Sequence, residues 1–417
     1  MAGRSAWAPP RPSIFCMHIP KTAGMALRLF LENQYPVSQI LPANDWPELL
    51  ALGLERLGDY HLFQGHFSCG LLDLLPAGLK SIVFLREPVA RTISHLKHLR
   101  RDPNFHPAHH LAAGRSLDDL VRDDRVMGLC CNVQSALLSN FVPGEVILAG
   151  LRRDRMEGRA PNADVFAAEP DLTTALATLE RFTFVGFVEE LQDDILRLAM
   201  ELGLHPPQSL PKRNFDPEGS TDLDSIEPET LAILRQRNAV DISLYESARQ
   251  RFTPRPRVTA GQVGAGLLAR GIYTSIAEPL ELAMTGAIPG SNWYSCEAAE
   301  GGGHRWTGPL RQTTLELPLA PGFDVEVSAF VLIGDLGELA IRSGKTDLPV
   351  MCHASDGDMH RISFHIPAAL VRGRGLTPIR FQTKKVFQPS DADLRPLSFL
   401  VRELAISRVE PSDTAIG

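Results

Sequence analysis

The stretch that decides the fold is residues 13–25, Ser-Ile-Phe-Cys-Met-His-Ile-Pro-Lys-Thr-Ala-Gly-Met. Residues 14–19 are a short apolar run with β-branched and aromatic side chains, which is typical of an inner strand of a parallel sheet. Leu27, Phe30 and Leu31 then recur at helical spacing. The pattern predicts a strand, a loop and a helix. The first free backbone N–H groups of the helix, and its positive dipole end, would face whatever lies beyond the strand.

The predicted loop has the composition of an anion site. Lys21 adds a positive charge, and Gly24 lets a ligand approach the backbone closely. The Walker A motif of P-loop NTPases has more residues between its glycines and places its lysine after the second one, so this loop is a different type. An ordinary strand, turn and helix with an exposed lysine is the alternative.

His18 to Gly24 resembles the 5′-phosphosulfate loop of the sulfotransferases that use 3′-phosphoadenosine 5′-phosphosulfate (PAPS). Within these enzymes it resembles the group that includes heparan sulfate 2-O-sulfotransferase and bacterial relatives. The resemblance implies that Lys21 is catalytic and that the cofactor is bound by Pro20, Lys21, Thr22, Ala23, Gly24 and Met25. Met25 and Ala26 replace hydroxyl-bearing residues of the family, which should weaken the contact with the 5′-phosphate.

The segment around Gly65-His66 continues the resemblance, at the end of a short predicted strand. In the family, the matching histidine takes the proton from the acceptor hydroxyl, which implies a catalytic role for His66. An imidazole suits this role because its pKa lies near the operating pH. Gln64 replaces a second histidine of the family. Taken alone, His66 also fits a hydrogen-bonded structural histidine.

Residues 80–88 contain the clearest pattern of a parallel strand, with Arg86 at the carboxyl end of the predicted strand. Open α/β sheets bind ligands at this carboxyl edge. Pro88 suits the first position of a helix, and Ser94 follows a little under two turns later. The resemblance implies that Arg86 and Ser94 hold the 3′-phosphate of PAPS, for which a guanidinium offers two parallel hydrogen bonds. A salt-bridged arginine beside a surface helix is the alternative.

Other segments extend the resemblance over residues 13–250, including a strand and helix at 184–202 and a closing helix around 241–245. Asn132-Val133-Gln134 weakly resembles an element that lines the acceptor channel. The histidine-rich segment 95–110 lacks a carboxylate or cysteine at metal-ligand spacing, so we expect no metal there. We interpret it as a basic rim or as a solvated helix face.

The pattern changes after residue 250. The Pro-, Gly- and Ala-containing residues 251–266 predict a linker, and residues 267–410 predict an antiparallel sandwich. Its alternating segments are 314–319, 324–333, 360–366, 378–383 and 397–406. The segments around Trp293 and Trp306 resemble a β-sandwich module of bacterial polysaccharide enzymes. Either tryptophan could stack on a sugar or belong to the core.

The whole chain has 417 residues, 44% of them hydrophobic, and a net charge of −7, which gives no sign of a nucleic-acid binder. Residues 1–12 are broken by prolines, so we expect a disordered N-terminus and no secretory signal. The sequence contains no apolar run of about twenty residues, so we expect no transmembrane helix. Six scattered cysteines without a CxxC pair predict buried thiols, and we expect a cytoplasmic protein. The sequence does not predict the oligomeric state.

We therefore expect an α/β fold: a P-loop-like, three-layer, parallel-sheet sulfotransferase domain followed by an all-β sandwich. The expected reaction moves a sulfuryl group from PAPS to a hydroxyl of an acceptor, such as a bacterial polysaccharide, leaves PAP and uses no metal. Two alternatives remain. One is a nucleotide-dependent kinase, and the other is a non-catalytic glycan-binding protein on a decayed sulfotransferase scaffold.

Overall fold

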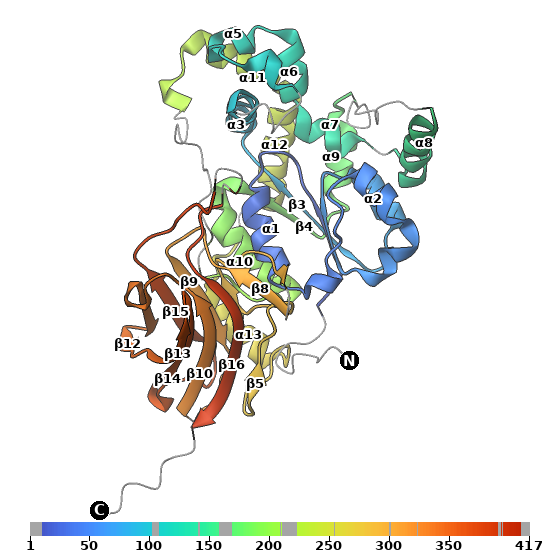
Figure 1. Ribbon diagram of the computed structural model, residues 1–417. Coiled ribbons are helices and arrows are strands. Elements are labelled where there is room, and N and C mark those ends of the chain that lie inside the picture. Colours follow the sequence, from blue (N-terminus) through green and yellow to red (C-terminus); the bar gives the residue numbers. More distant parts are fainter. Residues whose placement is uncertain are drawn as a thin grey trace, which may run out of the picture.

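The structure is a computed structural model that describes residues 11–409, apart from 102–107, 141, 158–168, 209, 211–222, 254, 300–301, 323, 391–392 and 394. An N-terminal α/β region lies against a C-terminal antiparallel β-sandwich (Figure 1). This confirms the predicted order of the two regions. Residues 1–10 of the expected disordered N-terminus lie outside the described residues, whereas Arg11 and Pro12 are hydrogen-bonded to Gly203 and Tyr35.

The α/β region is built on four parallel strands in the order β2-β1-β3-β4. They are β1 (Ile14–Met17), β2 (Leu62–Gly65), β3 (Lys80–Leu85) and β4 (Phe184–Phe187). Side chains alternate between the two faces of the sheet, so that Ile14 and Cys16 belong to one hydrophobic cluster and Phe15 and Met17 to another. Both faces are therefore buried, as the apolar strand sequences predict.

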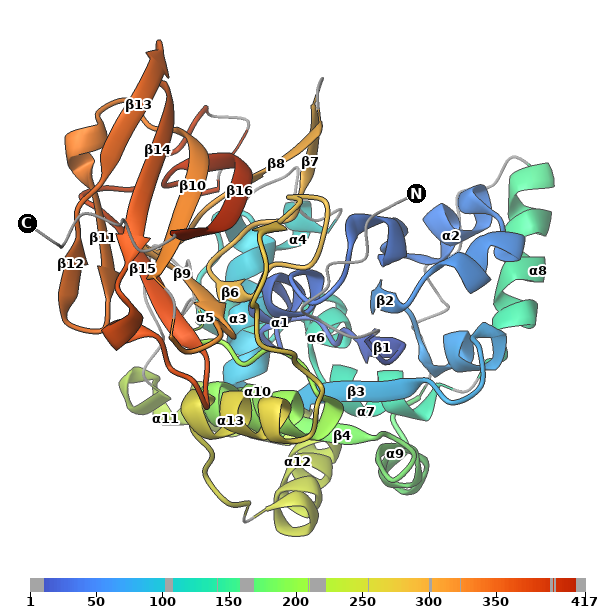
Figure 2. The ribbon, with the colours of Figure 1, turned by 90° about the horizontal axis from the view of Figure 1, so that it is seen from below.

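Helices cover both faces of the sheet (Figure 2). The face of Ile14 packs on α1 (Gly24–Glu32) and α10 (Leu191–Leu202). The opposite face packs on α2 (Trp46–Leu52), α7 (Val133–Ser139), α8 (Gly144–Met156), α9 (Leu172–Leu179) and α12 (Ala239–Phe252). A helical group with its own small core comprises α3 (Pro88–Arg101), α4 (His109–Ala112), α5 (Leu117–Val121), α6 (Asp124–Cys130) and α11 (Pro228–Arg237). The short 3₁₀ helices are η1 (Val37–Gln39), η2 (Leu54–Asp59), η3 (Cys69–Leu74), η5 (Val188–Glu190), η6 (Leu223–Ser225), η7 (Leu336–Glu338) and η8 (Ala368–Leu370).

The C-terminal region has two antiparallel sheets, as the alternating pattern predicts. One has the order β13-β14-β10-β16-β8-β7, with β5 paired to β16, and the other has the order β12-β11-β15-β9-β6. All five predicted segments are strands: β9 (Gln312–Leu317), β10 (Asp324–Leu332), β14 (Met359–Ile366), β15 (Thr377–Thr383) and β16 (Leu400–Val409). The others are β5 (Leu280–Glu281), β6 (Gly290–Ser291), β7 (Glu297–Ala299), β8 (Gly302–Trp306), β11 (Leu339–Ser343), β12 (Thr346–Leu348) and β13 (Met351–Asp356).

The junction between the regions differs from the predicted linker over 251–266. The helix α13 (Ala260–Ala269) begins inside this segment at a capping box formed by Thr259 and Gln262. Val263, Gly264 and Leu267 of α13 are buried, and a Cβ at Gly264 would lie 2.9 Å from Cδ1 of Leu376, so this side of the helix packs closely on the sandwich.

One hydrophobic cluster runs through both regions. It contains Leu27 and Phe30 of α1 together with Trp293, Leu315 and Phe364 of the sandwich. Trp293 is fully buried and donates its indole N–H to the carbonyl of Thr314 at 2.8 Å, so it is a core residue and not a sugar-stacking one.

The cysteines differ in their exposure to solvent. Cys16, Cys69 and Cys130 are buried thiols, whereas Cys352 is exposed on β13, contrary to expectation. The described part of the chain contains no helix that is both long enough and apolar enough to span a bilayer.

Candidate active site

The loop after β1 turns sharply into α1. Lys21 and Ala23 both adopt left-handed backbone conformations, with φ of 73° and 62°. Because non-glycine residues rarely adopt positive φ, the loop is a strained, specified turn. It brings the amino end of α1 to the carboxyl edge of β1, where the first N–H groups of the helix lack intrahelical acceptors.

Within this loop Thr22 uses both of its donors internally. Its buried hydroxyl donates to the carbonyl of Ile19 at 2.8 Å, and its backbone N–H donates to the same carbonyl at 3.3 Å. Met25 lies on the first turn of α1 with 51% of its side chain exposed. Pro20, Lys21, Ala23 and Gly24 are partly exposed.

Gly24 packs directly against the ring of His18. A Cβ at this position would lie 1.9 Å from Nε2 of His18, so the histidine ring occupies the space beside the glycine. Burial lowers the pKa of His18 to about 3, with smaller contributions from His66, Lys21 and Arg28. His18 is therefore a neutral packing residue beneath the loop.

Gly24→Ala is expected to lower the free energy of unfolding by about 1–3 kcal/mol, the usual cost of overpacking. In a His18→Ala background the same change should cost little, because the ring is gone and alanine favours a helix. Urea unfolding of the four proteins measures this coupling. Gly266→Ala in α13, where a Cβ would meet nothing within 4 Å, is the matched control. Equal costs in both backgrounds would contradict the assigned contact.

Arg86 joins the end of β3 to the loop after β1. Its guanidinium donates from Nη1 to the carbonyl of Lys21 at 3.1 Å. Gln134 clamps the backbone of Arg86 from both sides, accepting from its N–H and donating to its carbonyl, each at 2.9 Å. Gln134 is buried and therefore positions Arg86 through its backbone. Desolvation lowers the pKa of Arg86, and Glu189 opposes that shift.

A second arginine supports the loop from below. Arg91 on α3 is fully buried, and its guanidinium donates to the carbonyls of Pro20, at 3.4 Å, and of Cys130. The sequence could have indicated that Arg91 is buried, because Arg91 lies four residues before His95 and eight before Leu99, on the buried side of α3. Ser94 lies on the same helix and is partly buried, but no hydrogen bond links it to Arg86.

His66 follows β2 at the same edge of the sheet. Its ring lies 4.6 Å from that of His18, centroid to centroid, at an angle of 33°, which brings it beside the loop. The side chain is exposed on its other side. Desolvation by its neighbours lowers the pKa of His66; the Asp45 carboxylate opposes this shift and the Arg28 guanidinium adds to it. The ring is therefore neutral at pH 7, as a proton acceptor must be.

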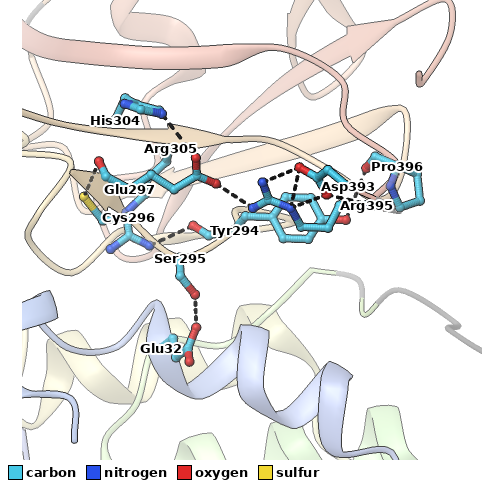
Figure 3. Close-up of polar contacts among 10 residues, drawn as sticks. All are labelled: Glu32, Tyr294, Ser295, Cys296, Glu297, His304, Arg305, Asp393, Arg395 and Pro396. Atoms are coloured by element: carbon cyan, nitrogen blue, oxygen red, sulfur yellow. Dashed lines mark hydrogen bonds and ion pairs between the residues drawn. The ribbon is translucent and has the colours of Figure 1, made fainter. Parts of the chain in front are cut away.

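Gln64 has a structural partner rather than an exposed role. Its amide donates to Oε1 of Glu32 at 2.7 Å, and Arg28 donates from Nε to the same oxygen at 2.6 Å. The other oxygen of Glu32 accepts from the hydroxyl of Ser295 (Figure 3). Glu32 thus connects α1, the strand β2 that precedes His66, and the C-terminal region. In the sequence, Glu32 stands out as an acid at the end of a largely apolar helix whose only other charged residue is Arg28.

The edge of the sheet thus brings Lys21, Arg86 and His66 from three neighbouring strands toward one region. The donor groups of this region are backbone N–H groups, an ammonium and a guanidinium, which is the chemistry of a phosphate or sulfate site. Among the described residues, no group of three or more His, Cys, Asp or Glu side chains is arranged to hold a metal ion.

No protein-family model matches the sequence, and no curated protein matches it either. Several solved structures match parts of the chain, among them a mannanase and a xylan-binding domain. A GH26-CBM35 β-(1,4)-mannanase of Podospora anserina is 10% identical with a TM-score of 0.20, over 33% of this chain and 29% of that enzyme. The CBM22-2 xylan-binding domain of Paenibacillus barcinonensis Xyn10C is 14% identical with a TM-score of 0.19, over 28% of this chain and 92% of that domain. Structural similarity this low supports no conclusion about the fold or function of either region.

Proposed function

We propose that the protein is a PAPS-dependent sulfotransferase that acts on a hydroxyl of a glycan acceptor. The observation that carries this proposal is the hydrogen bond from Arg86 to the carbonyl of Lys21, because it ties the two proposed anion-binding segments into one donor surface. The resemblance of His18–Gly24 and of the Arg86 segment to the family supports the same reading.

The residues present fit the cofactor by donor chemistry. Lys21 and backbone N–H groups at the amino end of α1 would hold the 5′-phosphosulfate, and Arg86 with Ser94 would hold the 3′-phosphate. PAPS, when bound, supplies an activated sulfuryl group. His66 would accept the proton of the attacking hydroxyl at an imidazole nitrogen, and Lys21 would stabilise the negative charge that develops on the leaving oxygen.

Isothermal titration calorimetry with PAP tests the cofactor site. Wild-type protein is expected to bind PAP with micromolar or lower Kd. Lys21→Ala and Arg86→Ala should each weaken binding by about 10–100-fold, the worth of a charge-assisted hydrogen bond. Lys345→Ala, on an exposed turn of the sandwich, should leave the affinity unchanged.

The alternatives give different results in the same experiment. Tighter binding of ATP than of PAP, with dependence on Mg²⁺, would replace the proposal by the kinase. PAP binding without transfer of labelled sulfate to any glycan would favour the non-catalytic glycan-binding protein, to which Met25 and Ala26 also point. Absence of binding to either nucleotide would refute the cofactor site.

A further inference from the structure

The outward face of the β7–β8 hairpin carries an aromatic and charged surface that the proposed chemistry does not use. Side chains alternate along β8, so His304 and Trp306 share one face while Arg305 points into the protein. Trp306 is partly buried and meets Phe387 edge to face, with ring centroids 5.8 Å apart. Phe387 is 40% exposed, so this pair presents apolar ring surface to solvent.

Charged side chains beside the hairpin hold one another in fixed orientations (Figure 3). Glu297 lies opposite His304 in the β7–β8 pairing and contacts it at 3.5 Å. Arg395 bonds Glu297 and Asp393, each at 2.6 Å, and stacks over the ring of Tyr294 at 5.5 Å. The side chains of Arg395, Glu297 and Asp393 are each about one third exposed. Their carboxylate and guanidinium groups can therefore contact a ligand.

This surface is next to the candidate active site. Leu29 of α1 forms a buried cluster with Tyr294 and Leu397, and Trp306 packs against that cluster. Met25, the exposed residue after Gly24, lies one helical turn before Leu29. From Ala23 to Leu29 the helix rises about 9 Å. A chain molecule of a few sugar units could therefore reach from Trp306 to the loop.

We propose that Trp306, Phe387, Glu297 and Arg395, here called the sugar platform, bind an uncharged segment of the polysaccharide acceptor. Ring C–H groups of a sugar carry a slight positive charge and suit the negative face of an aromatic ring. Paired planar carboxylate and guanidinium groups suit sugar hydroxyls, which donate and accept. Asp393 and Glu297 carry two negative charges and Arg395 carries one positive charge. This excess of negative charge repels a polyanionic chain. The inference rests on the proposed function for its acceptor role.

Tryptophan fluorescence measures binding without cofactor. Of the four tryptophans, Trp46 and Trp293 are buried and Trp7 lies outside the described residues, so Trp306 is the partly exposed reporter. The probes are neutral hexasaccharides of glucose, mannose, galactose and xylose, with a heparin hexasaccharide as the polyanion. We expect at least one neutral probe to bind and to change the emission, and heparin to bind more weakly.

Trp306→Ala and Phe387→Ala should each weaken neutral-probe binding at least tenfold, measured by calorimetry because the reporter is lost. Trp306→Phe should retain part of the affinity. Met351→Ala, a change of another exposed apolar side chain on β13, is the control and should bind as wild type. Unchanged melting temperatures will show that the variants are folded.

The possible failures are distinguishable. If no neutral probe binds, if heparin binds best, or if Trp306→Ala binds as wild type, the sugar platform is refuted whatever the protein does with PAP. If neutral probes bind through Trp306 but PAP does not bind, the platform stands and the proposed sulfotransfer falls. If both bind, Trp306→Ala should raise the KM for the acceptor and leave PAP affinity unchanged.

Discussion

Arg305→Met should lower the free energy of unfolding by about 4 kcal/mol or more, since each buried acceptor left without a donor costs about 1–3 kcal/mol. The wild-type guanidinium is fully buried and donates to the carbonyls of Met284, Gly286 and Tyr294 and to Oδ1 of Asn33, at 2.6–3.0 Å. Methionine fills similar space and supplies no donor. Desolvation lowers the pKa of Arg305 to about 10, so the residue remains charged at pH 7.

Urea unfolding followed by circular dichroism measures the effect of this change. Arg374→Met is the control, because Arg374 is exposed on a turn of the sandwich, and it should change the free energy of unfolding by less than about 0.5 kcal/mol. An Arg305→Met protein as stable as wild type would show that the four acceptors are satisfied without the guanidinium.

His66→Ala should reduce sulfuryl transfer by about 10²–10⁴-fold, the usual contribution of a general base. PAP binding should stay unchanged, because His66 is proposed to contact the acceptor. Since the pKa of His66 is lowered, its neutral form persists below the ordinary histidine pKa. The wild-type rate should therefore stay constant from pH 8 to below pH 6.5 and fall only in more acidic solution.

Rates of labelled sulfate transfer, measured from pH 4.5 to 8.5 with saturating PAPS, test this role. His61→Ala is the control at the beginning of the same strand, where the ring contacts the hydroxyl of Ser13 at 2.9 Å. Equal rates for His66→Ala and wild type would remove His66 from the catalytic role. So would a rate that falls with a midpoint above pH 6.5.

The parallel strands were predictable because both of their faces are buried, so that their sequences are continuous apolar runs. The central strands of the sandwich were predictable from alternation, and β10 is buried at every second residue. β13 was not, because all six of its residues are exposed at an edge and its sequence has no buried face. α13 was missed because its glycines and alanines resemble a linker until the surface they pack against is known.

For the candidate site, the order of the segments predicted which residues follow which strands. It could not predict partners that are distant in sequence. Gln134 lies 48 residues from Arg86, and Ser295 lies 263 residues from Glu32. The packing of Gly24 against His18 was likewise not predictable, because only the folded chain brings the two residues together. The local sequence pattern thus predicted the charged residues of the candidate site. The residues that orient them are known only from the tertiary structure.

The contacts of Asn33 limit how such a protein could acquire a different C-terminal module. This single residue, at the end of α1, accepts from Arg305, donates to the carbonyl of Trp293 at 3.1 Å and accepts through its own carbonyl from Ile288 at 2.9 Å. A transplanted module would have to reproduce all three bonds and complete the hydrophobic interior on α1. Recombination at this boundary would therefore yield folded chimeras only from donors that match both surfaces.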